Sequence, residues 1–441
     1  MKKCNALSES DFLKLFFAFL TAAFLIAAVC MPDRGQMLTG LWQILSNPCK
    51  ISTSFFAVGG YAATFLNMGL VALVCLALFV GLKATANNVS TLAFILTLGF
   101  SSWGITVLNL IPTMLGVALY CAVRREKLSA NVNAMLFSTG IAPLITELMV
   151  RYPNAEATGF TFGGILLALG VGLVIGFFLP AGLPNAPKVH HGFDLYSAAV
   201  PVGMTAFFLQ AVLYKTMGVA LPAAPAAETL QIASPVIANV FCCVVFGLCI
   251  LWALLLGCRP KDYWKLLTAP DQVSSVSAAC GKAVFLMNVG VYGLFILAYY
   301  NLIGATFNAV TFGIIFCMLA CCNSGSHPGT VWPLMVGYAI ASFLFGWLSG
   351  LAGGSFGGAL NAQAIAVGLC FCNGLSPISA KYGWKYGILA AALHYVLVTS
   401  VPNLHGGYCL YNGGFTAAFI CLLLIPILQR FTKTKGEKIS A

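Results

Sequence analysis

Long apolar runs, separated by short segments that contain charge, proline or glycine, follow one another along the whole chain. A helix needs about 20 apolar residues to cross the hydrocarbon core of a bilayer. Dividing the runs at charged residues and at Pro/Gly breaks predicts about fourteen helical elements. These elements span 12–31, 61–82, 91–103, 105–122, 131–149, 160–180, 192–213, 235–257, 283–302, 304–322, 328–347, 357–378, 384–402 and 408–428. The pattern predicts an all-α integral membrane protein with about 12–14 transmembrane elements.

Two neighbouring pairs of elements are short or interrupted. One spans 91–122 around Ser101-Ser-Trp-Gly104, and the other spans 304–347 around Asn323-Ser-Gly-Ser-His-Pro-Gly329. Each pair is either two spans or a re-entrant hairpin. Small residues at these tips let backbones approach closely, and a helix N-terminus near His327 attracts an anionic group. Tight turns at the membrane surface explain the same residues.

Composition supports a surface that faces lipid rather than water. Apolar residues make up 60% of the 441 residues and charged residues only 7%, and the mean hydropathy is +0.94. A soluble protein of this length needs far more charge on its surface. Many of the 17 cysteines lie inside apolar runs, so we interpret most of them as small buried hydrophobes and expect neither a disulfide framework nor a metal site.

The net charge of +11 predicts the orientation of the chain rather than nucleic-acid binding, because the basic residues fall in loops between apolar runs. With the N-terminus inside, 18 of the 22 basic residues lie on the cytoplasmic side. Arg34, Lys50, Arg151 and Lys215 remain outside. This split predicts that both termini are cytoplasmic and that the first run is an uncleaved helix, with a signal peptide as the alternative.

The chain also repeats itself. Asn67 and Gly69 recur as Asn288 and Gly290, at an offset of 221 residues. Ordered matches over about 150 residues are hard to obtain by chance, even in a chain rich in glycine and leucine. The other matched pairs, with 13 residues inserted after Gly337, are Gly104–Gly325, Pro112–Pro333, Met114–Met335, Gly116–Gly337, Phe137–Phe371, Gly140–Gly374, Pro143–Pro377, His190–His405, Gly192–Gly407, Leu195–Leu410 and Tyr196–Tyr411.

The two copies are predicted to have opposite orientations. Each contains six elements, and the single helix 235–257 lies between them, so the second copy enters the membrane from the other side. Inverted repeats are typical of channels and secondary transporters, whose sites lie near the midplane where broken helices meet. The predicted organisation is an N-terminal helix and outer loop (1–59), a first membrane repeat (60–215), a linker with one helix (216–280), an inverted second repeat (281–430) and a basic tail (431–441).

At His190-His-Gly-Phe-Asp-Leu-Tyr196 and His405-Gly-Gly-Tyr-Cys-Leu-Tyr411 the chain resembles a family of uncharacterised, clostridial-type bacterial membrane proteins that carry a duplicated domain of unknown function. The resemblance covers nearly all of 60–430. It implies a multi-pass protein of the bacterial cell membrane and supplies no activity. Ala142-Pro-Leu-Ile-Thr146 also resembles part of the Leu-Pro-x-x-Thr-x-Pro-Phe signature of urea transporters, whereas Ser376-Pro-Ile-Ser379 departs further from it.

Candidate pathway residues lie at paired breaks in the two copies. Backbone groups freed by proline or glycine in a membrane are satisfied by protein or by water. The backbone carbonyls at these breaks either contact a solute or are sealed by neighbouring helices. The buried side-chain amides either line the solute pathway or form hydrogen bonds between helices. His394 is an ionisable residue within an apolar helix and therefore a functional candidate. The pathway candidates are Asn67, Gly140, Pro143, Thr146, Asn288, His327, Gly374, Pro377, Ser379 and His394.

A second group of candidates lies toward the mouths of the pathway, as a vestibule or as groups that couple transport to an ion. Histidine titrates near neutral pH and relays protons, although His and Tyr also serve as interfacial anchors. Asp194 lies close enough in sequence to pair with His190 or His191. Glu147 either couples transport to H⁺ or Na⁺ or pairs with Arg151 at the i,i+4 spacing. The members are Glu147, His190, His191, Asp194, Tyr196, His405, Tyr411 and Asn412.

These features predict a membrane transporter or channel for a small polar solute or ion, with its pathway between the two inverted repeats. The alternatives are a structural or assembly protein without a pore and, less favoured, an intramembrane enzyme. Gly325-Ser-His327 lacks a carboxylate to orient a base, so we expect no enzymatic activity. We expect the lipid bilayer as a partner, no cofactor and no nucleic acid, and the pattern is compatible with a homo-oligomer.

Overall fold

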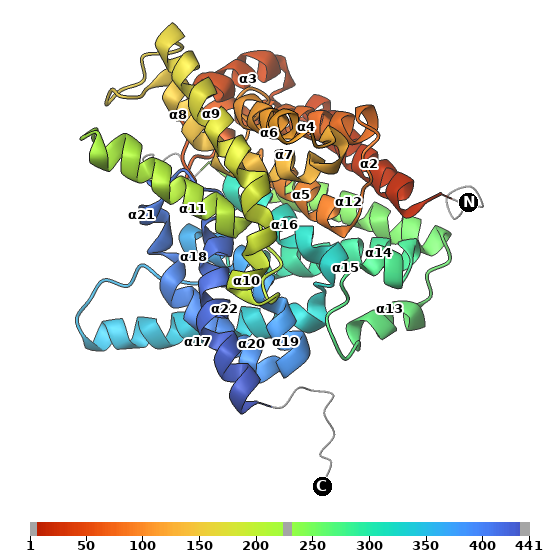
Figure 1. The fold of residues 1–441 in the computed structure, drawn as a ribbon. Coiled ribbons are helices and arrows are strands. Elements are labelled where there is room, and N and C mark those ends of the chain that lie inside the picture. The colour runs from red at the N-terminus through yellow and green to blue at the C-terminus, as the bar shows by residue number, and fades with distance from the viewer. Residues whose placement is uncertain (1–6, 224–231, 433–441) are drawn as a thin grey trace.

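The computed structural model describes residues 7–223 and 232–432, and all regular elements in these two ranges are helical (Figure 1). Nine helices in the described ranges are long and apolar enough to cross a membrane. These findings confirm an all-α, polytopic membrane protein. Most of the predicted basic tail lies outside the described residues, as do Lys2 and Lys3, which were counted as cytoplasmic charges.

The helices form two series in the same order. The first series is α2 (Glu9–Cys30), α3 (Met37–Ser46), α4 (Phe55–Gly81), α5 (Asn88–Phe100), α6 (Leu110–Arg124), α7 (Val132–Ser138), α8 (Ala142–Val150), α9 (Phe162–Gly182), α10 (Ala186–His190) and α11 (Ala199–Gln210). The second series is α12 (Pro235–Leu255), α13 (Pro260–Leu267), α14 (Val276–Ala279), α15 (Lys282–Leu302), α16 (Ala309–Leu319), α17 (Pro328–Leu351), α18 (Gln363–Cys372), α19 (Ser376–Tyr382), α20 (Trp384–Val398), α21 (Val401–Leu404) and α22 (Asn412–Phe431).

Some element boundaries differ from those predicted. The region expected as an outer loop contains α3, whose ten residues are too few to appear as a membrane span. Likewise, the linker between the repeats contains the short helices α13 and α14 in addition to α12. The element expected from residue 192 begins at Ala199, because the preceding turn includes glycine in the left-handed region at Gly192.

Both interrupted pairs have a short helix that stops inside the protein. α5 has 13 residues and α16 has 11, so at 1.5 Å per residue neither is long enough to cross a bilayer about 30 Å thick. α5 ends at an irregular segment before α6, and α16 ends in a 3₁₀ turn, Ala320–Ser324, before α17. In the second pair α17 has 24 residues and is long enough to span, whereas α6 of the first pair has 15 and is itself short.

α5 and α16 pack against each other in antiparallel directions. Ser102, just after α5, donates a hydrogen bond to the carbonyl of Ala309 at the start of α16 (2.7 Å). At the other end Asn323 donates to Thr91 near the start of α5 (3.1 Å). A Cβ added to Gly99 would lie 2.5 Å from the Sγ of Cys317, so the helices approach too closely for a larger residue there. Equivalent helices of the two series thus run in opposite directions side by side.

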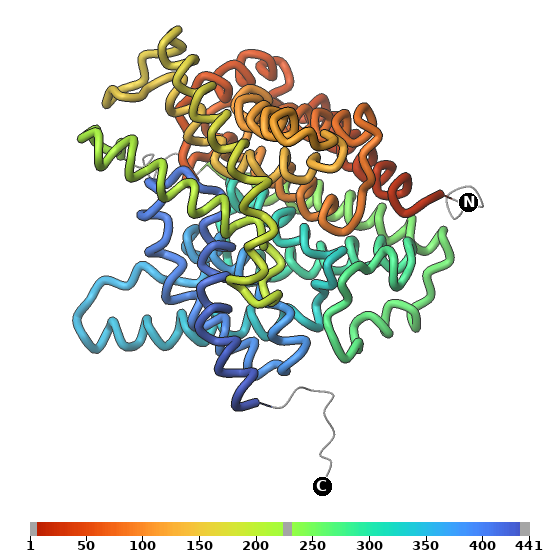
Figure 2. Tube along the Cα trace, in the orientation of Figure 1, coloured from red at the N-terminus to blue at the C-terminus, as the bar shows by residue number. Residues whose placement is uncertain are grey.

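The two series occupy adjoining halves of the molecule and exchange segments. In Figure 2 the red-to-yellow part of the trace fills the upper half of the view and the blue part the lower half. The yellow-green segment with α10 and α11 crosses over and packs on α22 of the second series. This exchange brings the repeated His-Gly motifs of each series against the helix breaks of the other.

Candidate functional site

Two buried asparagines hold the irregular segments that follow the short helices. Nδ2 of Asn67 in α4 donates to the carbonyls of Ser101 and Ile105, at 2.7 and 2.8 Å. Nδ2 of Asn288 in α15 donates to the carbonyls of Cys322 and Ser326, at 2.9 and 3.0 Å. All of these partners are related by the same offset of 221 residues. The sequence duplication therefore extends to individual hydrogen bonds, and these amides satisfy backbone groups that the breaks set free.

The breaks at Gly140 and Gly374 are closed by the opposite copy. The backbone N–H of Leu410 donates to the carbonyl of Gly140 (2.9 Å), and that of Leu195 donates to the carbonyl of Gly374 (3.0 Å). A Cβ at Gly140 would lie 2.3 Å from the ring of Tyr411. Only glycine, which has no Cβ, allows so close a contact. The two exchanged hydrogen bonds join the two breaks and the two His-Gly motifs into one central assembly.

Five buried aromatic residues, the aromatic cluster, fill the centre of this assembly. Tyr196 lies edge-on to Phe371 with ring centroids 5.2 Å apart, and Tyr411 lies edge-on to Phe137 at 6.4 Å. Phe100 joins the two pairs by stacking on Phe371 at 5.8 Å and by contacting Tyr411 at 5.1 Å. No member is more than 4% exposed. This aromatic cluster, called the plug below, is a buried contact between the two copies.

A cavity of about 550 Å³, vestibule A, opens on one side of the plug. It adjoins the start of α5 and the end of the 3₁₀ turn after α16. Asp194 lines it and is only 3% exposed. Burial raises the pKa of the Asp194 carboxyl to about 7. The lining residues are Asn88, Val89, Leu92, Asn133, Phe137, Leu183, Gly192, Asp194, Leu195, Ser197, Ala198, Gln272, Ser274, Ser324 and Pro377.

A second cavity of about 480 Å³, vestibule B, opens at the opposite end of the antiparallel α5–α16 pair. Its lining residue Gln363 accepts a hydrogen bond from Asn308, the N-cap of α16. The lining residues are Lys50, Ile51, Ser52, Leu221, Pro222, Gln363, Ala364, Val367, Val398, Thr399, Pro402, Asn403, Gly406, Gly407 and Asn412.

Vestibules A and B occupy equivalent places in the two copies. A minority of their lining positions correspond through the offsets that relate the repeated motifs. The equivalent pairs are Asn133–Val367, Gly192–Gly407, Ser197–Asn412 and Gln272–Ile51. Their polar groups differ, however, since Asp194 of vestibule A corresponds to Cys409, which is not part of the lining of vestibule B.

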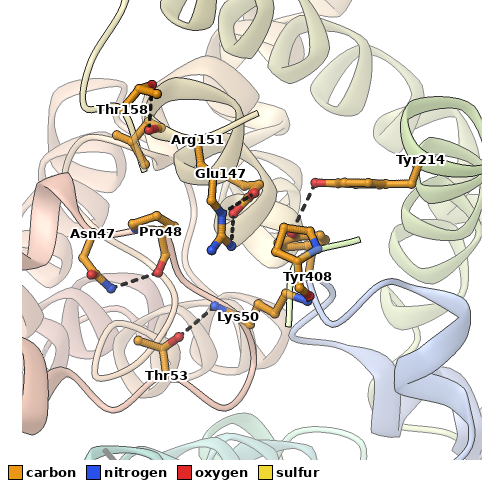
Figure 3. Close-up of polar contacts among 11 residues, drawn as sticks. Asn47, Pro48, Lys50, Thr53, Glu147, Arg151, Thr158, Tyr214 and Tyr408 are labelled. Atoms are coloured by element: carbon orange, nitrogen blue, oxygen red, sulfur yellow. Dashed lines mark hydrogen bonds and ion pairs between the residues drawn. The ribbon is translucent and has the colours of Figure 1, made fainter. Parts of the chain in front are cut away.

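A charged cluster borders vestibule B (Figure 3). Arg151 forms an ion pair with Glu147, with Nε 2.8 Å from Oε1 and Nη2 2.6 Å from Oε2, at the predicted i,i+4 spacing. Lys50 donates to the carbonyl of Pro222 and lies 5.2 Å from the ring centroid of Tyr408. Burial lowers the pKa of the Lys50 ammonium. Two cations and one carboxylate give this side of vestibule B a net positive charge.

The histidine candidates are dispersed. His394 is held between the hydroxyl of Tyr338 (2.6 Å) and the carbonyl of Gly413 (2.9 Å). His327 caps α17, where its Nδ1 accepts from a backbone N–H. His405 is buried against an aromatic ring. None of these three lines vestibule A or B.

Around vestibule A, His190 accepts a hydrogen bond from the backbone N–H of Asp194 at Nδ1 (3.3 Å), and its Nε2 lies 2.9 Å from the hydroxyl of Ser197. His191 is exposed and has a positive φ of 53°. The Asp194 carboxylate therefore forms an ion pair with neither histidine within the described ranges.

Among the proline-break candidates, only Pro377 lines a vestibule. Pro143 packs against Gly104, so the two prolines do not face each other across one cavity. Thr146 accepts a hydrogen bond from Asn109 (2.9 Å), and Ser379 packs against α20. Of the other candidates, Asn412 lines vestibule B, and Tyr196 and Tyr411 belong to the plug.

Several lining residues were absent from the sequence-based candidates, notably Lys50, Asn133 and Gln272. Gln272 lies in a polar segment before α14, and Lys50 lies in the loop after α3. Lys50 carried one usable signal, because it is one of few basic residues on the predicted outer side. Asn133 and Gln272 carried none, since isolated amides at element ends are common.

The fold and the paired cavities define a polytopic helical membrane protein built from a duplicated unit. The chain belongs to the family described as Protein of unknown function (DUF1576), whose model matches residues 33–215 and 259–430. The two matches confirm the predicted duplication. The matched ranges include the short helices α3 and α13. No curated protein matches the chain significantly, and neither does any solved structure. The similarity to urea transporters stays a prediction.

Proposed function

We propose that this protein is a transporter or channel for a small polar solute or ion. The observation that carries the proposal is the pair of equivalent vestibules at opposite ends of the α5–α16 pair, separated by a plug that both copies build. Phe137 lines vestibule A, and Asn412, the neighbour of Tyr411, lines vestibule B. A structural protein needs no cavities on both sides of one plug, whereas a pathway does.

We further propose that the two copies are inverted in a cell membrane, with both termini cytoplasmic. The antiparallel packing of α5 and α16 supports this, because equivalent helices would run in the same direction if the copies had the same orientation. Charge supports it too, since the loop 124–127 is strongly basic and the equivalent loop 346–358 has no charge. In this arrangement vestibule A faces the cytoplasm and vestibule B faces outward.

The plug makes this structure a closed state. Moving solute between the vestibules requires Tyr196 and Tyr411 to leave their contacts with Gly374 and Gly140. Those contacts are exchanged between the copies, so a small rotation of one copy against the other would loosen both together. Broken helices and repeats that rock around a central site are the means by which inverted-repeat transporters alternate access.

Flux through liposomes that contain the full chain tests the function. We expect uptake of at least one member of a panel of ammonium, methylammonium, urea, small carboxylates, Na⁺ and H⁺. Ser197→Trp in vestibule A and the equivalent Asn412→Trp in vestibule B should each abolish that uptake. Leu423→Trp, on an exposed apolar face, is the matched control and should leave it unchanged. Absence of flux for the whole panel would favour the structural alternative.

Sidedness is tested by labelling. Gln272→Cys and Ser52→Cys, one in each vestibule, are placed in a background where Cys4, the exposed Cys30 and Cys243 and the half-buried Cys280 are serine. A membrane-impermeant maleimide applied to intact cells should label only Ser52→Cys, and applied to inverted vesicles only Gln272→Cys. Labelling of both from one side would contradict the inverted arrangement without contradicting transport.

A further inference from the structure

Vestibule A contains buried oxygen acceptors that have no hydrogen-bond partner in the described part of the chain. They are Oδ2 of Asp194, Oδ1 of Asn133 and Oε1 of Gln272. The three side chains come from segments far apart in the chain and line one cavity. A buried polar atom without a partner costs free energy, so these three acceptors require hydrogen-bond donors from whatever fills the cavity, whether water or a ligand.

Two amide donors of the same cavity are already engaged. Nδ2 of Asn88 donates to the carbonyl of Ser274 (2.8 Å), and Nε2 of Gln272 donates to the carbonyl of Ser324 (2.7 Å). The second bond also fixes which end of the Gln272 amide is the free oxygen. Asp194 and Gln272 thus present free acceptors to vestibule A, whereas the Asn133 amide, with no hydrogen bond within the described residues, offers both an acceptor and a donor. The Asp194 carboxylate suits a cationic ligand and disfavours an anion.

The Asp194 carboxylate has no compensating cation among the residues that the structure describes. Its Oδ1 accepts from the backbone N–H of Tyr196 (2.9 Å), and within residues 7–223 and 232–432 it forms no ion pair. His190 offers it no proton, since Nδ1 of that ring accepts from the backbone of Asp194. The other titratable groups that face it are the thiols of Cys321, Cys372 and Cys421.

We propose that vestibule A binds a small organic cation with a primary ammonium group. Such a group supplies a positive charge and three N–H donors, which match the free oxygens of Asp194, Asn133 and Gln272. The alkyl part of the ligand lies against the apolar side of the cavity, formed by Leu92 and Leu183 among others. A bare Na⁺ or Ca²⁺ would need a compact shell of oxygens instead, and a cavity of about 550 Å³ with a mostly apolar lining does not provide one.

This inference names the solute class of the proposed pathway and, for transport, rests on the proposed function. Binding is measured separately from flux, on the full chain in nanodiscs with radiolabelled n-butylammonium at pH 8. We expect saturable binding that excess ethylammonium displaces and that neutral n-butanol and NaCl at equal concentration do not. Asp194→Asn should weaken binding about tenfold or more, as expected for loss of a hydrogen bond to a charged group.

Matched variants separate the site from general effects. Asp271→Asn removes an exposed carboxylate one residue from Gln272 and should leave the affinity unchanged. Asn133→Ala removes a second free acceptor at a half-buried position and should weaken binding several-fold even if Asp194→Asn fails to fold. Equal binding by wild type, Asp194→Asn and Asn133→Ala would overturn the proposal, as would no saturable binding. Binding with no flux of any amine would overturn the transport function and leave this site standing.

Discussion

Replacing Asn67 with leucine removes the amide that satisfies the irregular segment between α5 and α6. The change removes the hydrogen bonds of 2.7 and 2.8 Å that the carbonyls of Ser101 and Ile105 accept from Asn67. All three residues are fully buried. A buried acceptor that loses its partner costs about 1–3 kcal/mol. Two such losses lower the free energy of unfolding by about 2–6 kcal/mol, since membrane interior offers no water to replace them.

The equivalent change in the second copy should cost more. Asn288→Leu likewise frees two carbonyls, and it also removes the acceptor of the Tyr263 hydroxyl, which lies 3.2 Å from Oδ1. The extra loss is about 1 kcal/mol, the usual net value of one hydrogen bond. Asn67 has no such third partner among the described residues, where its Oδ1 accepts no hydrogen bond.

Unfolding by SDS in mixed micelles, followed by circular dichroism, measures both values in the same detergent. Asn154→Ala, in an exposed loop, is the control and should change stability by no more than about 0.5 kcal/mol. The reasoning would be refuted if both leucine variants were as stable as this control. It would also be refuted if Asn67→Leu were clearly the more damaging of the two.

Two further predictions use the same unfolding assay, and a third uses the nanodisc binding assay. Gly140→Ala places a Cβ 2.3 Å from a tyrosine ring and should lower stability by about 1–3 kcal/mol, whereas Gly170→Ala, with open space around it, should not. Glu147→Gln should lower the free energy of unfolding by about 3–5 kcal/mol, because it leaves the charge of the largely buried Arg151 without its carboxylate partner. Replacing both residues by leucine should lower it less, and an equal loss in the two variants would contradict a buried ion pair. Binding of n-butylammonium should be about tenfold weaker at pH 6 than at pH 8, because Asp194, with a pKa of about 7, becomes neutral as the pH falls; an unchanged affinity would contradict its role.

The class of the protein and its duplication were predictable because each is written locally in the chain. Run length and the scarcity of charge require a lipid environment whatever the packing. The paired motifs could be matched without any knowledge of contacts, and the two matches to the family confirm them. Short amphipathic elements such as α3 escaped prediction, since ten residues give no span-length signal.

The candidate site was predictable only in part. Asn67 and Asn288 stood out as repeated amides in apolar runs, and the structure shows that they bond to backbone carbonyls. Asp194 stood out as an acid near a repeated motif and was expected to pair with a histidine. Within the described residues it pairs with none, and one of its carboxylate oxygens accepts no hydrogen bond. The partners of a side chain depend on which segments the fold brings beside it, and the repeat did not reveal that the motifs are exchanged between copies.

The sequence by itself determined that this chain is a duplicated bundle of membrane helices with breaks at equivalent places, because hydropathy, charge and residue identity are properties of single segments. Only the tertiary structure decided where the polar groups gather. Lys50 meets Pro222 across 172 positions, and Asn133, Asp194 and Gln272 reach one cavity from separate elements. The physical reason is that a cavity is the space that packed helices leave unfilled, and its lining follows from their packing and not from any one segment.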